Sequence, residues 1–248
     1  MSGKGPGFFS DIGRSGRDIL TKDYNSDQRF TISSSANSGL DLKSTLVKSR
    51  GLSSGDVTAE FKYKNKVVNF KVDTESNFEV QYLHDHVAFT LGVGLTRSPA
   101  IDFSGTMGTP SIAFGAETSY STSLAKFTKY NAGLCFKMPS SSASVILGDK
   151  GDSMKVSYLH QLERLNGGAV VGEISRRFST NENTLTVGCS LVVDSQTVLK
   201  AKLNNHGNLG ALLQHELTSK SFLTISGAFE TKDLDKNPKF GFSLLLKP

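Results

Sequence analysis

The sequence has no tryptophan and only two cysteines, Cys135 and Cys189, among its 248 residues. Two cysteines so far apart exclude a disulfide scaffold or a zinc knuckle, and we interpret both as reduced side chains. Long apolar runs are also missing. Hydrophobic residues make up 37% of the chain, and the longest apolar runs are as short as Val87–Phe89 and Leu244–Leu246. A helix that crosses a bilayer needs about 20 consecutive apolar residues, so we expect no transmembrane helix. The N-terminus also lacks the apolar core of a cleavable secretory signal.

Positive charge is in modest excess, with a formal net charge of +5 at pH 7. Such a balance fits a nucleic-acid partner, a membrane surface or a lumen that favours anions. Composition alone does not choose among these three.

The first twenty-odd residues follow a helical pattern. Between Phe8 and Leu20 the apolar residues recur near helical spacing, two glycines share one side, and charged residues fill the remaining positions. The apolar residues are Phe9, Ile12, Ile19 and Leu20, the glycines are Gly13 and Gly16, and the charged residues are Asp11, Arg14, Arg17 and Asp18. The pattern predicts a short amphipathic helix, which needs a surface to lie on because short helices are marginal alone in water. We therefore divide the chain into an N-terminal helical segment, residues 1–25, and a second part, residues 26–248.

In this second part the period of the apolar residues changes from 3.6 to 2. Val57, Ala59, Phe61 and Tyr63 alternate with polar side chains, and similar alternation recurs to the C-terminus, for example at 66–73, 199–204 and 239–247. Clusters rich in Asn, Asp and Gly separate the segments and predict turns. Dividing roughly 220 residues by about 12–13 per strand and turn gives on the order of 17 or 18 strands. A sheet of this size is expected to close into a barrel, because open edges are a liability.

The polar face of these strands decides between a soluble and a membrane barrel. A soluble barrel packs its interior with apolar side chains. Here the second face carries Lys, Glu, Asn, Ser and Gly in strand after strand. We therefore predict an all-β fold, a transmembrane antiparallel β-barrel with a polar lumen and an apolar outer face.

Three stretches resemble the voltage-dependent anion channels of the mitochondrial outer membrane (eukaryotic porins), of plant type. Residues 5–24 resemble the N-terminal helix of that family. Residues 194–211 resemble the porin signature, although Leu191 stands where that signature usually has an aromatic residue or His. The C-terminal set Lys239, Gly241, Leu244 and Leu246 matches the sorting signal read during insertion into that membrane. The likeness extends over essentially the whole chain.

The resemblance also points to a gap. Mitochondrial channels of this family have 19 strands, whereas this chain is shorter by roughly one hairpin, which would lie between Asn77 and Phe78. Loss of two adjacent strands preserves antiparallel alternation, so we expect about 17 strands, a parallel closure of the first and last strand, and a turn at Asp73–Asn77. The absent hairpin carries a Gly-Leu-Lys motif that the family associates with nucleotides, so no such site is predicted here.

By resemblance, the chain is expected to be a voltage-gated, weakly anion-selective pore for small metabolites and ions, with anions such as nucleotides as permeants. Its surroundings would be the lipids of the mitochondrial outer membrane; no cofactor, no metal and no specific nucleic-acid ligand are expected, and a homo-oligomer is left open. The expected lumen-facing lysines are Lys62, Lys64, Lys71, Lys200 and Lys202. The expected pore-helix residues are Asp11, Ile12, Arg14, Arg17, Asp18, Leu20 and Lys22.

The sequence also bears on other kinds of site and on other kinds of barrel. The His84-Asp85-His86 triplet does not favour a metal site, because on a strand the aspartate points away from both histidines. We find no pattern typical of an enzyme. The alternatives are a soluble ligand-binding barrel of lipocalin type, a related protein-import barrel, and a shortened, non-conducting barrel that acts as an interaction partner of full-length channels.

Overall fold

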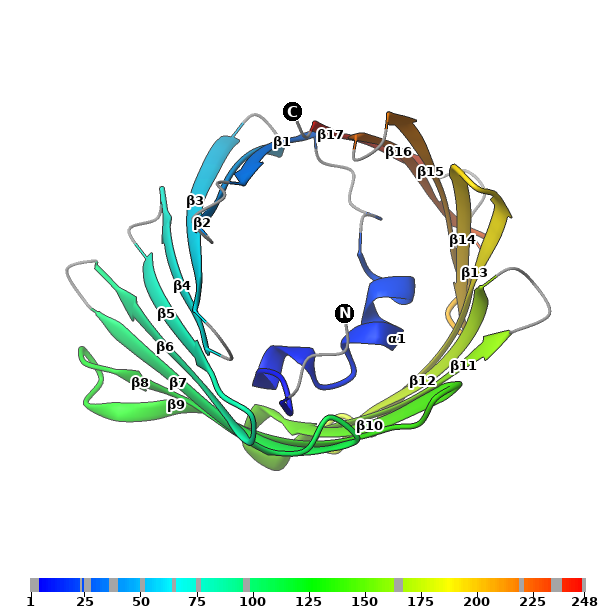
Figure 1. The fold of residues 1–248 in the computed structure, drawn as a ribbon. Helices are drawn as coiled ribbons and strands as arrows, with labels where there is room; N and C mark the ends of the chain where they lie inside the picture. Colours follow the sequence, from blue (N-terminus) through cyan, green and yellow to red (C-terminus); the bar gives the residue numbers. More distant parts are fainter. Residues whose placement is uncertain are drawn as a thin grey trace.

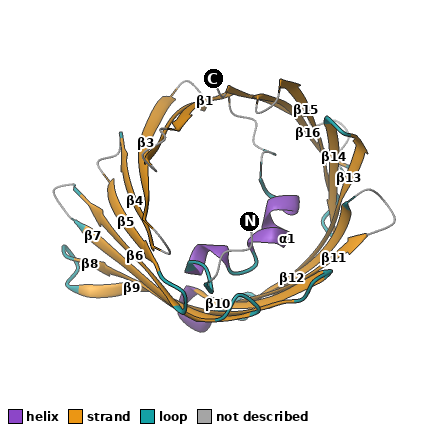
Figure 2. Ribbon diagram, viewed as in Figure 1, coloured by secondary structure: helices purple, strands orange, loops and turns teal. Residues whose placement is uncertain are grey.

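In a computed structural model, the chain forms one ring of β-strands with a helical segment inside it (Figure 1). The structure describes residues 5–22, 24, 28–35, 40–49, 52–63, 66–74, 77–95, 99–162, 167–218, 221–232 and 238–246. Within these ranges 17 strands make a single sheet, drawn as the orange ring in Figure 2. No helix in the described ranges is long and apolar enough to cross a bilayer.

The strands follow one another around the ring, and each is seven to thirteen residues long. In chain order they are β1 (Gln28–Ser35), β2 (Leu40–Ser49), β3 (Leu52–Tyr63), β4 (Lys66–Asp73), β5 (Asn77–Leu83), β6 (Val87–Gly94), β7 (Ala100–Gly108), β8 (Ile112–Ser121), β9 (Lys126–Lys137), β10 (Ser141–Gly148), β11 (Ser153–Leu162), β12 (Gly168–Arg177), β13 (Glu182–Asp194), β14 (Thr197–Asn204), β15 (Asn208–Thr218), β16 (Ser221–Glu230) and β17 (Lys239–Leu246). A short 3₁₀ turn, η2 (Asp149–Gly151), lies between β10 and β11.

The ring closes between its first and last strand. Each strand pairs antiparallel with the next, from β1–β2 through β16–β17, whereas β1 pairs with β17 in parallel, from Gln28 opposite Phe242 to Ile32 opposite Leu246. An odd number of strands in simple up-and-down order requires this one parallel pair. The predicted strand number and closure are confirmed.

The strands on either side of the missing hairpin pair directly with each other. β4 and β5 are antiparallel neighbours, with Val72 opposite Phe78. The Asn77 backbone NH donates to Asp73 Oδ1 at 2.9 Å, and its side-chain amide donates to Asp73 Oδ2 at 3.0 Å. The Thr74 NH donates to the Gly55 carbonyl oxygen on β3 at 2.9 Å. This hydrogen-bonded connection lets a barrel shorter by two strands close.

The contacts of the helical segment identify the two faces of the wall. Ala113 and Cys135 pack beneath it and are 3% exposed, so they face the lumen. Because successive residues of a strand point to opposite faces, their neighbours point outward. Phe114 and Phe136 are accordingly 52% and 42% exposed. Large apolar side chains line this outer face around the ring, as a lipid-facing surface requires.

The N-terminal segment differs from the predicted single helix. It consists of a 3₁₀ turn, η1 (Phe9–Asp11), and an α-helix, α1 (Arg14–Leu20). Gly13 stands between them with φ of 66°, a left-handed conformation that favours glycine. The apolar residues keep their helical spacing, but the bend at Gly13 directs η1 and α1 toward different parts of the wall.

Candidate functional site: the helical segment inside the barrel

The first half of the segment packs on β8–β10. Phe9 and Ile12 are 7% and 2% exposed and form one cluster with Ala113 and Cys135, with Ile146 beside it. Gly133 lies directly below: a Cβ atom built there would meet two Ile12 carbons at 3.1 and 3.2 Å. Burying each large apolar side chain contributes roughly 1.5–3 kcal/mol. This half of the segment is therefore held by apolar packing.

The second half packs on β11–β13. Ile19 and Leu20 are 7% and 2% exposed and share a cluster with Leu159, Ala169 and Val171. On β13, Gly188 leaves the room that Leu20 occupies, since a Cβ atom there would stand 2.5 Å from Leu20 Cδ2. A side chain at this position would force Leu20 to move.

Small residues bring the bend close to the wall. A Cβ on Gly13 would lie 2.5 Å from Ser144 Oγ, and one on Gly16 would lie 3.1 Å from Val171 Cγ2. Below them the hydroxyls of Ser144 and Ser157 satisfy each other at 2.7 Å. The two glycines of the amphipathic pattern thus belong to the contact surface of the segment, together with its apolar residues.

Two of the predicted lumen lysines bind the end of α1. Lys200 Nζ donates to the Asp18 carbonyl oxygen at 3.2 Å, and Lys202 Nζ donates to the Leu20 carbonyl oxygen at 2.6 Å. Carbonyls in the last turn of a helix have no partner within the helix, and cations are favourable there. Lys202 also lies 4.2 Å from the centroid of the Tyr24 ring, a cation–π contact. Burial raises the pKa of Tyr24 to about 12.

The charged residues of the segment lie away from this packed side. Arg14 pairs with Asp11 at 2.7 Å and with Asp18 at 3.7 Å. A guanidinium nitrogen of Arg17 donates to the carbonyl oxygen of Ser10, and Lys22 is exposed after the helix. The segment thus places apolar residues on the wall and charged residues toward the lumen.

The other predicted lumen lysines lie on β3 and β4. Lys71 is half-buried on β4, opposite Glu79 of β5. The backbone of Lys62 belongs to β3, but its side chain lies outside the described residues, as does the whole of Lys64. These three lysines remain predictions as pore-lining groups.

Further charges of the inner face are paired. Lys129 Nζ lies 2.8 Å from Glu117 Oε1, and Lys155 Nζ lies 3.5 Å from Glu173 Oε1. Such cross-strand pairs reduce the contribution of each lysine to the net charge of the lumen.

The predicted sorting signal lies on the last strand. Lys239, Gly241 and Leu244 belong to β17, and the backbone of Leu246 ends it. Leu244 and Leu246 stand opposite Phe30 and Ile32 in the closing ladder, although the side chain of Leu246 is outside the described residues. The role of this strand in sorting stays a prediction.

Several residues of the site carry no charge, and the sequence analysis missed them. Ala113, Cys135, Leu159, Val171 and Gly188 occupy the face that is polar in other strands. These apolar and small residues, which interrupt the polar inner face of β8–β13, are the signal that would have located the footprint of the segment.

Comparison with known proteins agrees with this architecture. The sequence model of the eukaryotic porin family matches residues 5–80 and 68–241. Mitochondrial outer membrane protein porin 2 of Arabidopsis thaliana is 47% identical over 274 aligned positions, which cover 99% of both chains. Mitochondrial outer membrane protein porin 5 of Oryza sativa subsp. japonica is 47% identical over 277 positions, covering 100% of both. These alignments exceed the 248 residues of the chain, as expected for a missing hairpin.

A shorter relative lacks this difference in length. A putative mitochondrial outer membrane protein porin 5 of Arabidopsis thaliana is 43% identical over 245 positions, covering 99% of both chains. Among solved structures, a triple mutant of the Rhodopseudomonas blastica porin has a TM-score of 0.57 at 10% identity, covering 86% of this chain and 95% of that one. At that identity the likeness concerns the fold alone.

The closed barrel with its internal helix therefore defines a membrane channel protein and not an enzyme. The chain belongs to the eukaryotic porin family, as a plant voltage-dependent anion channel type of the mitochondrial outer membrane.

Proposed function

We propose that this chain forms a voltage-gated, weakly anion-selective diffusion pore for small metabolites and ions, including nucleotides, across the mitochondrial outer membrane. The observation that carries the proposal is the closed ladder of hydrogen bonds around the ring. β4 pairs with β5 across the missing hairpin, and β1 pairs with β17. A barrel without an open edge is the form in which strands can span a bilayer.

Lys202 supports the anion preference. Both of its contacts, the Leu20 carbonyl oxygen and the Tyr24 ring, are to uncharged groups, so they leave the positive charge of Lys202 in the lumen. A positive charge in a narrow low-dielectric tube raises the local concentration of anions. The paired Lys129 and Lys155 contribute less, which fits a weak preference.

Voltage gating requires charges that move in the transmembrane field. The helical segment carries Arg14, Arg17 and Lys22, and of these Arg14 and Lys22 are exposed. Their movement across the field requires Ile12 and Leu20 to leave the wall, each at roughly 1.5–3 kcal/mol. We infer that the docked segment belongs to the conducting state, because this packing opposes its release.

The test is the conductance of the refolded protein in a planar bilayer under a salt gradient. We expect large steps, a reversal potential of the sign that anion preference gives, and a fall to lower conductance at high voltage of either polarity. Cation preference or voltage-independent current would contradict the corresponding part of the proposal. Folded, β-rich protein without any conductance would instead favour the shortened barrel as an interaction partner of full-length channels.

A further inference from the structure

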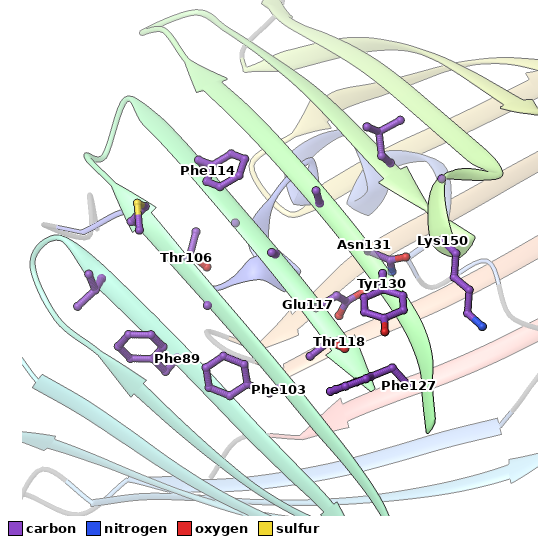
Figure 3. Close-up of a pocket in the computed structure, with 18 residues that line it drawn as sticks. Phe89, Phe103, Thr106, Phe114, Glu117, Thr118, Phe127, Tyr130, Asn131 and Lys150 are labelled. Carbon is purple, nitrogen blue, oxygen red and sulfur yellow. Dashed lines mark hydrogen bonds between the residues drawn. The ribbon is translucent and has the colours of Figure 1, made fainter. Parts of the chain in front are cut away.

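The outer face of the barrel has an apolar hollow over β6–β10. Its volume is about 850 Å³, within the range of ~300–1,000 Å³ typical of small-molecule sites. Figure 3 shows the rings of Phe89, Phe103, Phe114 and Tyr130 around it, with Lys150 at the end near Tyr130. These side chains point away from the lumen, so the hollow faces the membrane.

The floor of the hollow is a row of small residues on neighbouring strands. Gly105 of β7 stands opposite Ala116 of β8, which stands opposite Ala132 of β9. The row ends at Phe89 of β6, opposite Gly105, and at Leu147 of β10, opposite Ala132. Because both end residues are large, the three small ones between them form a depression in the wall.

Larger residues flank this row along the strands. Toward one end of the strands, Thr118 is paired with Phe103 on one neighbouring strand and with Tyr130 on the other. Toward the opposite end, Met107 is paired with Phe114. All four large side chains are 46–60% exposed. The side with Phe103 and Tyr130 therefore has a gap at Thr118, between two aromatic walls.

A positive charge marks the end of the hollow near Tyr130. Lys150 lines the hollow from the exposed turn η2. The carboxylates beside it are engaged elsewhere: Asp149 lies 3.2 Å and Asp152 lies 3.9 Å from nitrogens of Arg177. No carboxylate in the described part of the chain pairs with Lys150.

We propose that this hollow binds one phospholipid of the membrane, with an acyl chain against the Gly105–Ala116–Ala132 floor and the phosphate at Lys150. The outward face of the barrel meets lipid, which supplies the apolar part of the occupant. A lysine at the headgroup level attracts anionic lipids by roughly 1 kcal/mol, and aromatic rings are favourable at that depth. A sterol would fill the hollow but would leave Lys150 without a charged partner.

The absence of tryptophan from the chain provides the assay. Phe114→Trp places a single fluorophore in the wall of the hollow. Phe242→Trp on β17 is the matched control, because Phe114 is 52% and Phe242 is 50% exposed on the outer face. Each variant is refolded into phosphatidylcholine bilayers in two series. One series contains increasing fractions of brominated phosphatidylglycerol, and the other contains increasing fractions of brominated phosphatidylcholine. Brominated acyl chains quench tryptophan on contact.

We expect brominated phosphatidylglycerol to quench Phe114→Trp at a mole fraction about fivefold lower than brominated phosphatidylcholine does. Phe242→Trp is expected to show no such difference. Adding Lys150→Gln to Phe114→Trp should remove the difference, and so should high salt, which screens the headgroup contact. Adding Ala116→Leu should weaken quenching by both lipids, because it fills the floor of the hollow.

Three results would overturn the proposal. Equal quenching by the two lipids at Phe114→Trp would mean ordinary boundary lipid only. A difference that survives Lys150→Gln would remove the lysine from the site. Relief of quenching by an added sterol at a lower fraction than by unlabelled phosphatidylglycerol would identify a sterol as the occupant.

Discussion

The docking of the helical segment can be measured through Cys135. This thiol lies beneath Phe9 and Ile12 and is 3% exposed on the lumen side of β9. A water-soluble thiol reagent that enters the pore reaches it only when the segment leaves the wall. In a Cys189→Ser background Cys135 is the single thiol of the chain, so its labelling rate reports the population of the undocked state, provided that redocking is faster than labelling.

Leu20→Ala is the perturbation we would choose. Leu20 is 2% exposed and packs in the second cluster, away from Cys135. Truncating a buried leucine to alanine costs about 2–5 kcal/mol. At about 1.4 kcal/mol per factor of ten, the lower limit predicts labelling of Cys135 that is roughly 30-fold faster.

The control for this experiment is Lys22→Ala, because Lys22 is exposed on the same segment. It should leave the labelling rate unchanged, and circular dichroism should show the same β-barrel in all variants. Rapid labelling of Cys135 without the Leu20 change would refute a docked segment. A rate unaffected by Leu20→Ala would refute joint release of η1 and α1, and would mean that the bend at Gly13 uncouples them.

Three further outcomes follow from the same contacts. Gly188→Val should place its side chain in the space of Leu20, so labelling of Cys135 should accelerate as much as in Leu20→Ala, and an unchanged rate would contradict the close approach. Lys202→Gln removes a charged hydrogen bond worth about 1.5–3 kcal/mol and one positive charge; the reversal potential under a salt gradient should move toward zero, and a shift toward stronger anion preference would be the opposite of this expectation. Burial raises the pKa of Tyr24 to about 12, so its neutral form stabilises docking fully below the ordinary pKa near 10, and this contribution is lost as the pH rises through about 12. In an absorbance titration, the unmodified chain should show a tyrosinate signal near pH 12 that Tyr24→Phe does not show. If the signal that Tyr24→Phe lacks appeared near pH 10 instead, the ring of Tyr24 would be exposed.

The strands and their two faces were predictable because the period-2 pattern is local. The alternation at Val57–Tyr63 specifies a strand with one apolar face wherever that strand lies. The shortened barrel was also predictable, since a loss of two strands keeps the direction of all later ones. Hydrogen bonds between Asp73 and Asn77 then form the connection.

The fit of the segment to the wall was not predictable in this way. Lys200 and Lys202 alternate with apolar residues as lumen lysines should, yet their partners, Asp18 and Leu20, are 182 residues away in sequence. The bend at Gly13 was equally hidden, because a glycine within a helical pattern is compatible with both a continuous and an interrupted helix.

The sequence by itself determined the class of fold and the two faces of the wall, because both depend on the residue period within each strand. Only the tertiary structure decided which part of the wall receives the helical segment, and which small residues on the outer face line up as Gly105, Ala116 and Ala132 do. These features depend on the register between strands and on contacts between distant segments. The residue period within a single strand depends on neither of them, so it cannot predict them.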